Sequence, residues 1–148
     1  MSLLDQVSVV IETDFVVVIN KPAGLMVHGD GRTGRPHLAQ WIQKNYPETD
    51  GVGEPIQREG KPDIPRPGIV HRLDKETSGV VIVVRNQKAY EHIKKQFKNR
   101  TIKKEYQTLV YGEITNPSFT IDEPSVSKNG THPPDPRASE INPPSGSL

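Results

Sequence analysis

A charged stretch in the middle of the chain, 71–79, carries the residues best suited to chemistry. Asp74 follows Arg72 by two positions, and the small turn-forming residues Thr77 to Gly79 come three positions later. The stretch precedes the apolar run 80–84, so a polar loop leads straight into a strand, a position where function often concentrates. A guanidinium beside a carboxylate can orient it and favour its charged form. The alternative is a strand-end turn with a surface ion pair, worth roughly 0.2–1 kcal/mol.

Two further segments accompany this loop in a fixed order. Upstream lies Val18-Ile19-Asn20-Lys21-Pro22-Ala23-Gly24-Leu25-Met26-Val27-His28, and the loop itself is preceded by Gly68-Ile69-Val70. Downstream are Lys104-Glu105-Tyr106, then Val110 and Gly112. Taken together, these three segments resemble the RluA family of RNA pseudouridine synthases.

The resemblance implies a fold, a reaction and a set of ligands. The fold class is α+β, with a mixed, largely antiparallel sheet, flanking helices and a catalytic cleft. The reaction converts a uridine of structured RNA, either rRNA or tRNA, to pseudouridine: the N-glycosidic bond breaks, the uracil rotates and it rejoins through carbon. The resemblance implies no metal and no organic cofactor.

The resemblance also implies roles for individual residues. Asp74 corresponds to the catalytic carboxylate, which attacks the ribose or the uracil or promotes a glycal intermediate. Arg72 corresponds to the arginine that takes the place of the flipped-out base, whose extrusion costs a few kcal/mol. Tyr106 corresponds to the aromatic residue that stacks on the flipped uracil, an interaction worth ~1–3 kcal/mol; the alternative is a tyrosine packed within a sheet. For His71 we expect a role in fixing the loop rather than in proton transfer.

Basic side chains are concentrated in one window. The net charge of the chain is only +1, yet 85–104 holds eight basic residues and one acidic residue. Such a concentration favours a directed contact with a polyanion, although a solvated lysine-rich helix face has the same composition. The predicted RNA-binding residues are His71, Arg32, Arg35, Lys88, Lys94, Lys95, Lys98, Arg100, Lys103 and Lys104.

Hydrophobic periodicity predicts the elements that hold these residues. We expect strands at 7–11, 15–19 and 25–28, a helix at 36–46, a central strand at 79–85, a helix capped by Asn86, and a strand at 100–112. The glycine-rich stretch 29–34 formally matches a dinucleotide-binding fingerprint, but no second parallel strand follows. We therefore interpret it as a loop, in which Arg32 and Arg35 can meet phosphate.

The sequence predicts two regions. The resemblance implies that residues 1–124 are a partial pseudouridine synthase catalytic domain. Composition predicts that 125–148 form a disordered tail, because seven of the fourteen prolines lie beyond 115 and apolar residues become rare. Relatives continue with a segment resembling Gly-Arg-Thr-His-Gln-Ile-Arg, whose first arginine pairs with the catalytic aspartate, and no such segment occurs here. We therefore expect an incomplete fold with exposed sheet edges and self-association.

Composition also excludes some classes of protein. The chain has no cysteine, which rules out disulfides and thiolate metal sites and fits a cytoplasmic protein. No apolar run approaches the ~20 residues of a membrane helix. Two alternatives to an active enzyme remain: a catalytically incomplete relative that binds RNA, and a non-enzymatic scaffold whose lysine-rich helix binds acidic protein partners.

Overall fold

The computed structural model describes residues 2–31, 33–113, 115, 118–121, 126–127, 130–131 and 139–141. The chain divides into two units, Met1–Lys104 and Glu105–Leu148. The first unit contains the Asp74 loop and both helices.

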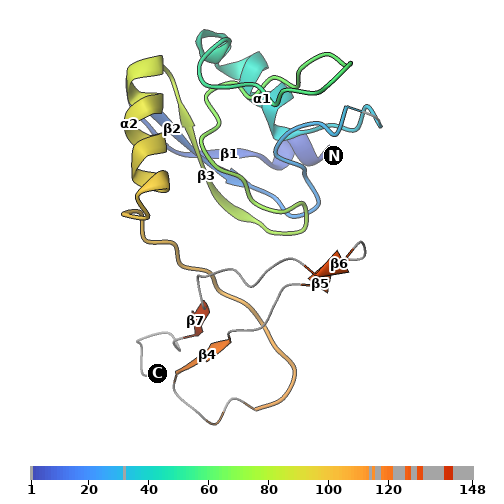
Figure 1. Ribbon diagram of the computed structural model, residues 1–148, viewed down its shortest axis with the longest axis vertical. Helices are drawn as coiled ribbons and strands as arrows, with labels where there is room; N and C mark the ends of the chain where they lie inside the picture. Colours follow the sequence, from blue (N-terminus) through green and yellow to red (C-terminus); the bar gives the residue numbers. More distant parts are fainter. Residues whose placement is uncertain are drawn as a thin grey trace. The chain divides into compact units, whose positions relative to one another are not determined.

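The first unit is built on a three-stranded sheet with the order β1-β2-β3 (Figure 1). The strands are β1 (Ser8–Glu12), β2 (Val16–Lys21) and β3 (Gly79–Val84), and both pairings are antiparallel. Runs of β-branched residues favour this extended conformation. A tight turn joins the first two strands, since the Thr13 N–H donates to the Val16 carbonyl at 2.9 Å. The predicted strands at 7–11 and 15–19 are confirmed.

Two helices flank the sheet, as the sequence predicted (Figure 1). Helix α1 (Leu38–Asn45) buries Leu38, Ala39 and Ile42. These residues share one core with alternate positions of the strands, whose period of two places them on the same face. The strand contribution to this core is Val17, Ile19, Val81 and Val83.

Helix α2 (Gln87–Lys98) begins where predicted, because the Asn86 Oδ1 accepts a hydrogen bond from the Ala89 N–H at 2.9 Å. Two short 3₁₀ helices, η1 (Leu3–Gln6) and η2 (Pro47–Thr49), complete the helical elements described in this unit. Two helices with an antiparallel sheet confirm the predicted α+β class.

The position of β3 differs from the prediction of a central strand. β2 is central, and β3 lies at the edge of the sheet. The outer side of β3 is occupied by the incoming chain, since the Val84 N–H donates to the Gly68 carbonyl at 2.9 Å and Ile69 bridges Val83. This close approach requires a glycine: Gly68 has a φ of 63°, and a Cβ there would lie 2.1 Å from the Val84 oxygen.

Two further strand predictions were wrong. Residues 100–112 form no strand. Residues 25–28 form only an isolated bridge, between Met26 and His37. Their carbonyls have another use, since Met26 and Val27 accept hydrogen bonds from the Leu38 and Ala39 N–H groups at 2.8 and 2.9 Å. They thereby satisfy free donors at the start of α1.

The second unit contains short antiparallel pairings. β4 (Phe119–Ile121) pairs with β7 (Ser139–Ile141), and β5 (Val126–Ser127) pairs with β6 (Gly130–Thr131). The two units meet at Lys104 and Glu105, and the predicted domain boundary at 124 stays a prediction. Three of these strands fall within 125–148, and the other residues of that predicted tail lie outside the described residues. Disorder there stays a prediction.

The outer edge of the sheet is apolar and exposed. All five residues of β1 are exposed, including Val10 at 56% and Ile11 at 54%. An exposed hydrophobic edge strand presents unpaired backbone groups to another chain. Self-association through this edge stays a prediction.

His71 joins the start of the loop 71–79 to the sheet and to α2. Its Nε2 accepts a hydrogen bond from the Ile82 N–H at 2.9 Å, and its ring stacks on Phe97 with 4.9 Å between centroids. Burial lowers the pKa of His71 to about 4, and the charge of Lys104 acts in the same direction. The neutral ring can accept the Ile82 hydrogen bond, whereas the imidazolium cannot.

We predict that His71 makes the fold acid-sensitive. The unfolded chain takes up this proton near pH 6.5 and the folded chain only near pH 4, so stability is complete above 6.5 and falls as the pH drops toward 4. The loss should be on the order of 3 kcal/mol. In His71→Gln, an amide oxygen can accept the same hydrogen bond without titrating. Urea unfolding of both proteins across this range should show a steeper loss in the parent; equal slopes would contradict the assignment.

Candidate functional site

The carboxylate of Asp74 is exposed to solvent. Its side chain is 87% exposed and that of Arg72 is 61% exposed, with 4.0 Å between the Asp74 Oδ1 and the Arg72 Nη2. The structure thus brings the two predicted residues together, but as a loose surface pair of the kind worth roughly 0.2–1 kcal/mol. Between them, Leu73 is only 8% exposed and belongs to the core. A buried leucine therefore holds the backbone while its two charged neighbours face water.

A buried lysine that we did not predict forms a hydrogen bond with the backbone of the loop 71–79. Lys21, the last residue of β2, is fully buried. Its Nζ donates to the carbonyls of Pro22 at 3.0 Å, Leu25 at 2.8 Å and Lys75 at 3.1 Å. The Lys75 carbonyl also accepts a hydrogen bond from the Gly24 N–H at 2.8 Å. Since Lys75 follows Asp74 directly, the ammonium of Lys21 fixes the backbone next to the candidate carboxylate.

The three carbonyls make this buried charge tolerable. An ammonium has three donors, and here each has an acceptor, which offsets much of the cost of removing it from water. Burial lowers the pKa of Lys21, while the negative charges of Glu76 and Asp74 act in the opposite direction. The ammonium of Lys21 and the Asp74 carboxylate therefore attract each other. Lys21 thus adds a second positive charge near Asp74, besides that of Arg72.

The sequence contained a signal for Lys21. We interpreted Lys21 to Gly24 as a turn. However, the alternation of β2 places Val17, Ile19 and position 21 on the same buried face. A lysine at such a position must find acceptors, and the turn that follows it supplies two of them.

Most of the predicted RNA-binding cations lie on or after α2. Lys94 is partly buried and forms an ion pair with Glu54. The exposed members are Lys88, Lys95, Lys98, Arg100, Lys103 and Lys104. The geometry leaves an exposed basic surface along α2 and the residues that follow it, and its contact with RNA stays a prediction.

The remaining predicted residues are spread over the chain. Arg35 is exposed, while Arg32 lies outside the described residues. Tyr106 belongs to the second unit and is 63% exposed, so its stacking role stays a prediction. In the described part of the chain, no cluster of three His, Cys, Asp or Glu side chains could hold a metal ion. Within the same residues, no helix has the length and apolar character needed to cross a membrane.

Comparisons with known proteins identify relatives of the chain. It is 34% identical over 113 residues to an uncharacterized RNA pseudouridine synthase, YlyB, of Bacillus subtilis, covering 76% of this chain and 34% of that protein. It is 37% identical over 106 residues to the ribosomal large subunit pseudouridine synthase D of Neisseria meningitidis, covering 72% of this chain and 25% of that protein. The chain thus spans between a quarter and about a third of the length of these relatives.

A family model described as RNA pseudouridylate synthase matches residues 15–141. The match contains the Lys21 turn, the Asp74 loop and Tyr106, and it continues beyond the predicted boundary at 124. Because this match covers most of the sequence, the chain belongs to the RNA pseudouridylate synthase family.

Proposed function

We propose that this chain isomerises uridine to pseudouridine in structured RNA, with Asp74 as the catalytic carboxylate. The observation that carries the proposal is the placement of Asp74: its side chain is exposed while the backbone beside it is fixed by Lys21. Catalysis needs a group that substrate can reach and that does not have to be positioned anew in each reaction. An exposed carboxylate on a fixed loop meets both needs.

The reaction requires the carboxylate to lie close to the glycosidic bond. A uridine inside an RNA fold meets this requirement only after it leaves its stack, at a cost of a few kcal/mol. In this proposal Arg72, whose Nη2 lies 4.0 Å from the Asp74 Oδ1, replaces interactions that the RNA gives up when the base is extruded. Attack on the ribose, attack on the uracil and formation of a glycal are all compatible with this arrangement.

Ribosomal RNA is the first substrate to test. The printed name of the Neisseria relative refers to the large ribosomal subunit, and that name describes only the relative. For this chain we propose rRNA as the substrate, with tRNA as the alternative. The exposed cations of α2 would attract either polyanion, and such a contact adds affinity without sequence preference.

One observation favours a second candidate, a relative that binds RNA without turnover. Arg72 is the one cation with a direct ion pair to Asp74 in the described residues, and that pair is long and exposed. The activity of the whole relatives can depend on residues beyond the third of their length that this chain matches. A scaffold for acidic proteins is the remaining alternative, and loss of all RNA binding would favour it.

We predict that Asp74→Asn abolishes catalysis and leaves the fold intact. Pseudouridine formation, measured by chromatography of the nucleosides from digested rRNA, should fall by about 10³-fold or more. The free energy of unfolding should change by no more than about 0.5 kcal/mol, because the side chain is exposed. Glu76→Gln is the matched control, since it removes an exposed carboxylate from the same loop and should leave turnover unchanged.

Three results would separate the candidates. Equal turnover by the parent and Asp74→Asn would refute the assigned role. RNA binding without turnover in the parent would support the second candidate. Failure of the parent to bind RNA at any salt concentration would leave the scaffold.

We predict that the salt dependence of RNA binding identifies the basic surface. In the double variant Lys95→Gln/Lys98→Gln, the slope of log affinity against log salt should become shallower by about one for each phosphate that the variant no longer binds. Lys94→Gln should change it less, because Glu54 already neutralises that ammonium. Lys44→Gln, which removes one positive charge from α1, is the control. Fluorescence anisotropy with labelled rRNA fragments provides the measurement, and a slope in the double variant equal to that of Lys44→Gln would contradict this surface.

A further inference from the structure

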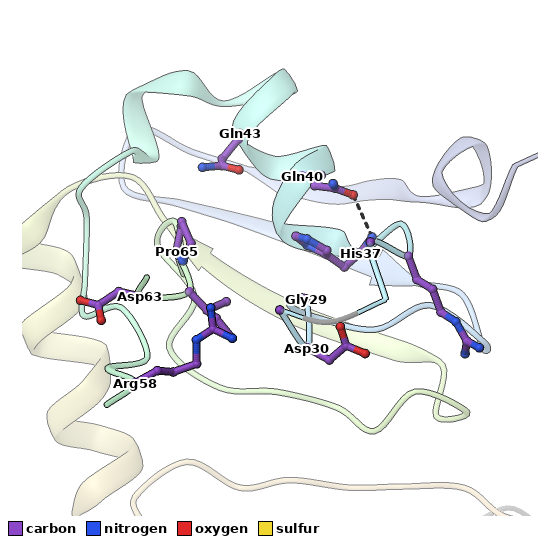
Figure 2. Close-up of a pocket in the computed structure, with 12 residues that line it drawn as sticks. Gly29, Asp30, His37, Gln40, Gln43, Arg58, Asp63 and Pro65 are labelled. Carbon is purple, nitrogen blue, oxygen red and sulfur yellow. Dashed lines mark hydrogen bonds between the residues drawn. The ribbon is translucent and has the colours of Figure 1, made fainter. Parts of the chain in front are cut away.

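A hollow of about 500 Å³ lies in the first unit beside α1, apart from the Asp74 carboxylate (Figure 2). Three segments form its walls. They are the glycine-rich loop with Gly29 and Gly31, the side chains of His37 and Gln43 from the α1 region, and the loop that carries Arg58. Figure 2 shows residues of all three segments around the same space.

The lining holds two arginines and two aspartates, so its formal charge is balanced, and what an entering anion meets depends on where these side chains point. Both carboxylate oxygens of Asp30 accept hydrogen bonds from Thr33, at 2.9 Å from its N–H and 2.8 Å from its hydroxyl. Asp63 points away from Gly29 and Asp30 in Figure 2. Arg58 and Arg35, by contrast, carry positive charge on opposite segments of the wall. An anionic group that enters beside Arg58 therefore meets a guanidinium, which suits phosphate because it presents several donors in a plane.

Arg58 is held in place for such a contact. Its Nε and Nη2 both donate to the Pro62 carbonyl, at 2.8 and 2.6 Å. Its Nη1 lies against Gly31, where an added Cβ would come within 2.0 Å of that nitrogen. Gly31 thus leaves room for the guanidinium of Arg58, and the Pro62 carbonyl fixes the plane of that group.

Polar groups of α1 complete the wall. The Gln40 Oε1 accepts a hydrogen bond from the His37 N–H at 3.2 Å, drawn as a dashed line in Figure 2. The buried Nδ1 of His37 has no hydrogen-bond partner within the described part of the chain. The amide of Gln43 can both donate and accept. The Gln43 amide therefore suits a nucleobase edge, since a base also carries donors and acceptors.

Arg35 lines both this hollow and a second one that reaches the loop 71–79. The second hollow has a volume of about 300 Å³ and is also lined by Gly24, Met26 and Lys75. The Gly24 N–H donates to the Lys75 carbonyl, and Lys75 adjoins Asp74. A single strand leaving the target uridine can therefore follow one surface from the Asp74 loop, past Arg35, to Arg58.

We propose that the larger hollow binds an unpaired nucleotide adjacent to the target uridine, with its phosphate at Arg58 and its base against Gln43. This inference rests on the proposed function, because the nucleotide belongs to the same RNA strand. The site makes the enzyme prefer a target within a single-stranded loop over one within a duplex, since the neighbouring base must be free to enter.

The test uses the full chain and a short fluorescein-labelled oligouridylate, with binding followed by anisotropy. Arg58→Gln should weaken binding about tenfold or more, as expected for loss of a charge-assisted hydrogen bond to phosphate. The matched control is Lys61→Gln, an exposed cation of the same loop, which should change affinity less than about twofold. A duplex RNA of the same length should bind the parent and Arg58→Gln equally.

A second pair of variants tests the hollow without changing charge. Gln43→Trp places a large side chain into the space and should weaken oligouridylate binding to a similar degree, whereas Gln57→Trp, on the exposed side of the loop, should not. Unfolding in urea checks that α1 remains folded in Gln43→Trp. If α1 unfolds in Gln43→Trp, Arg58→Gln still tests the site independently.

The outcomes separate this inference from the proposed function. Weaker binding in both hollow variants and normal binding in both controls supports the nucleotide site. Turnover by the parent, with oligouridylate binding unaffected by Arg58→Gln and Gln43→Trp, overturns the site and leaves the function standing. No binding and no turnover by the parent overturns both.

Discussion

The first unit depends on one buried ammonium group. Lys21 ends β2 opposite Gly79, the first residue of β3, so it stands where the loop 71–79 enters the sheet. Its three hydrogen bonds connect the end of β2, the turn that follows and the loop. A charge in this position must be fully satisfied, because an unpaired buried ammonium would cost several kcal/mol. The turn and the loop must therefore keep their carbonyl oxygens directed toward the Lys21 ammonium.

Other anchors act on the same loop at different points. Leu73 inserts into the core, and His71 accepts a hydrogen bond from β3 while it stacks on α2. These contacts hold the backbone on both sides of Asp74 and leave the carboxylate in solvent. The loop thus combines a fixed path with an exposed functional group, which is the arrangement expected of a site that acts on a large ligand.

The loop that follows α1 is also tied to the rest of the unit. The Gly53 N–H donates to the Gln87 Oε1 at 2.9 Å, and Glu54 pairs with Lys94, so the loop is attached to α2 before it reaches Arg58. A basic residue that the sequence assigned to RNA is here used to hold the protein together. This explains why charge counts alone overestimate the cations available to a polyanion.

Local patterns predicted much of this fold. Short runs of Val and Ile residues located β1, β2 and β3, and Asn86 marked the start of α2. The prediction of a strand at 100–112 was wrong because a strand also needs a pairing partner, which a local apolar pattern does not supply. Likewise, the spacing of Arg72 and Asp74 indicated a pair, but the distance and exposure of that pair depend on how Leu73 is buried. Lys21 was missed because a lysine before a proline resembles an ordinary turn.

The most direct test of this account is hydrogen exchange at the Gly24 amide in Lys21→Met. Because Lys21 holds the Lys75 carbonyl that accepts this N–H, exchange at Gly24 should become about tenfold faster or more, while exchange at Ile19 in the centre of β2 changes little. Lys75→Met, which alters an exposed side chain, should leave both rates unchanged. Unaltered exchange at Gly24 in Lys21→Met would contradict the claim that this buried ammonium positions the loop that carries Asp74.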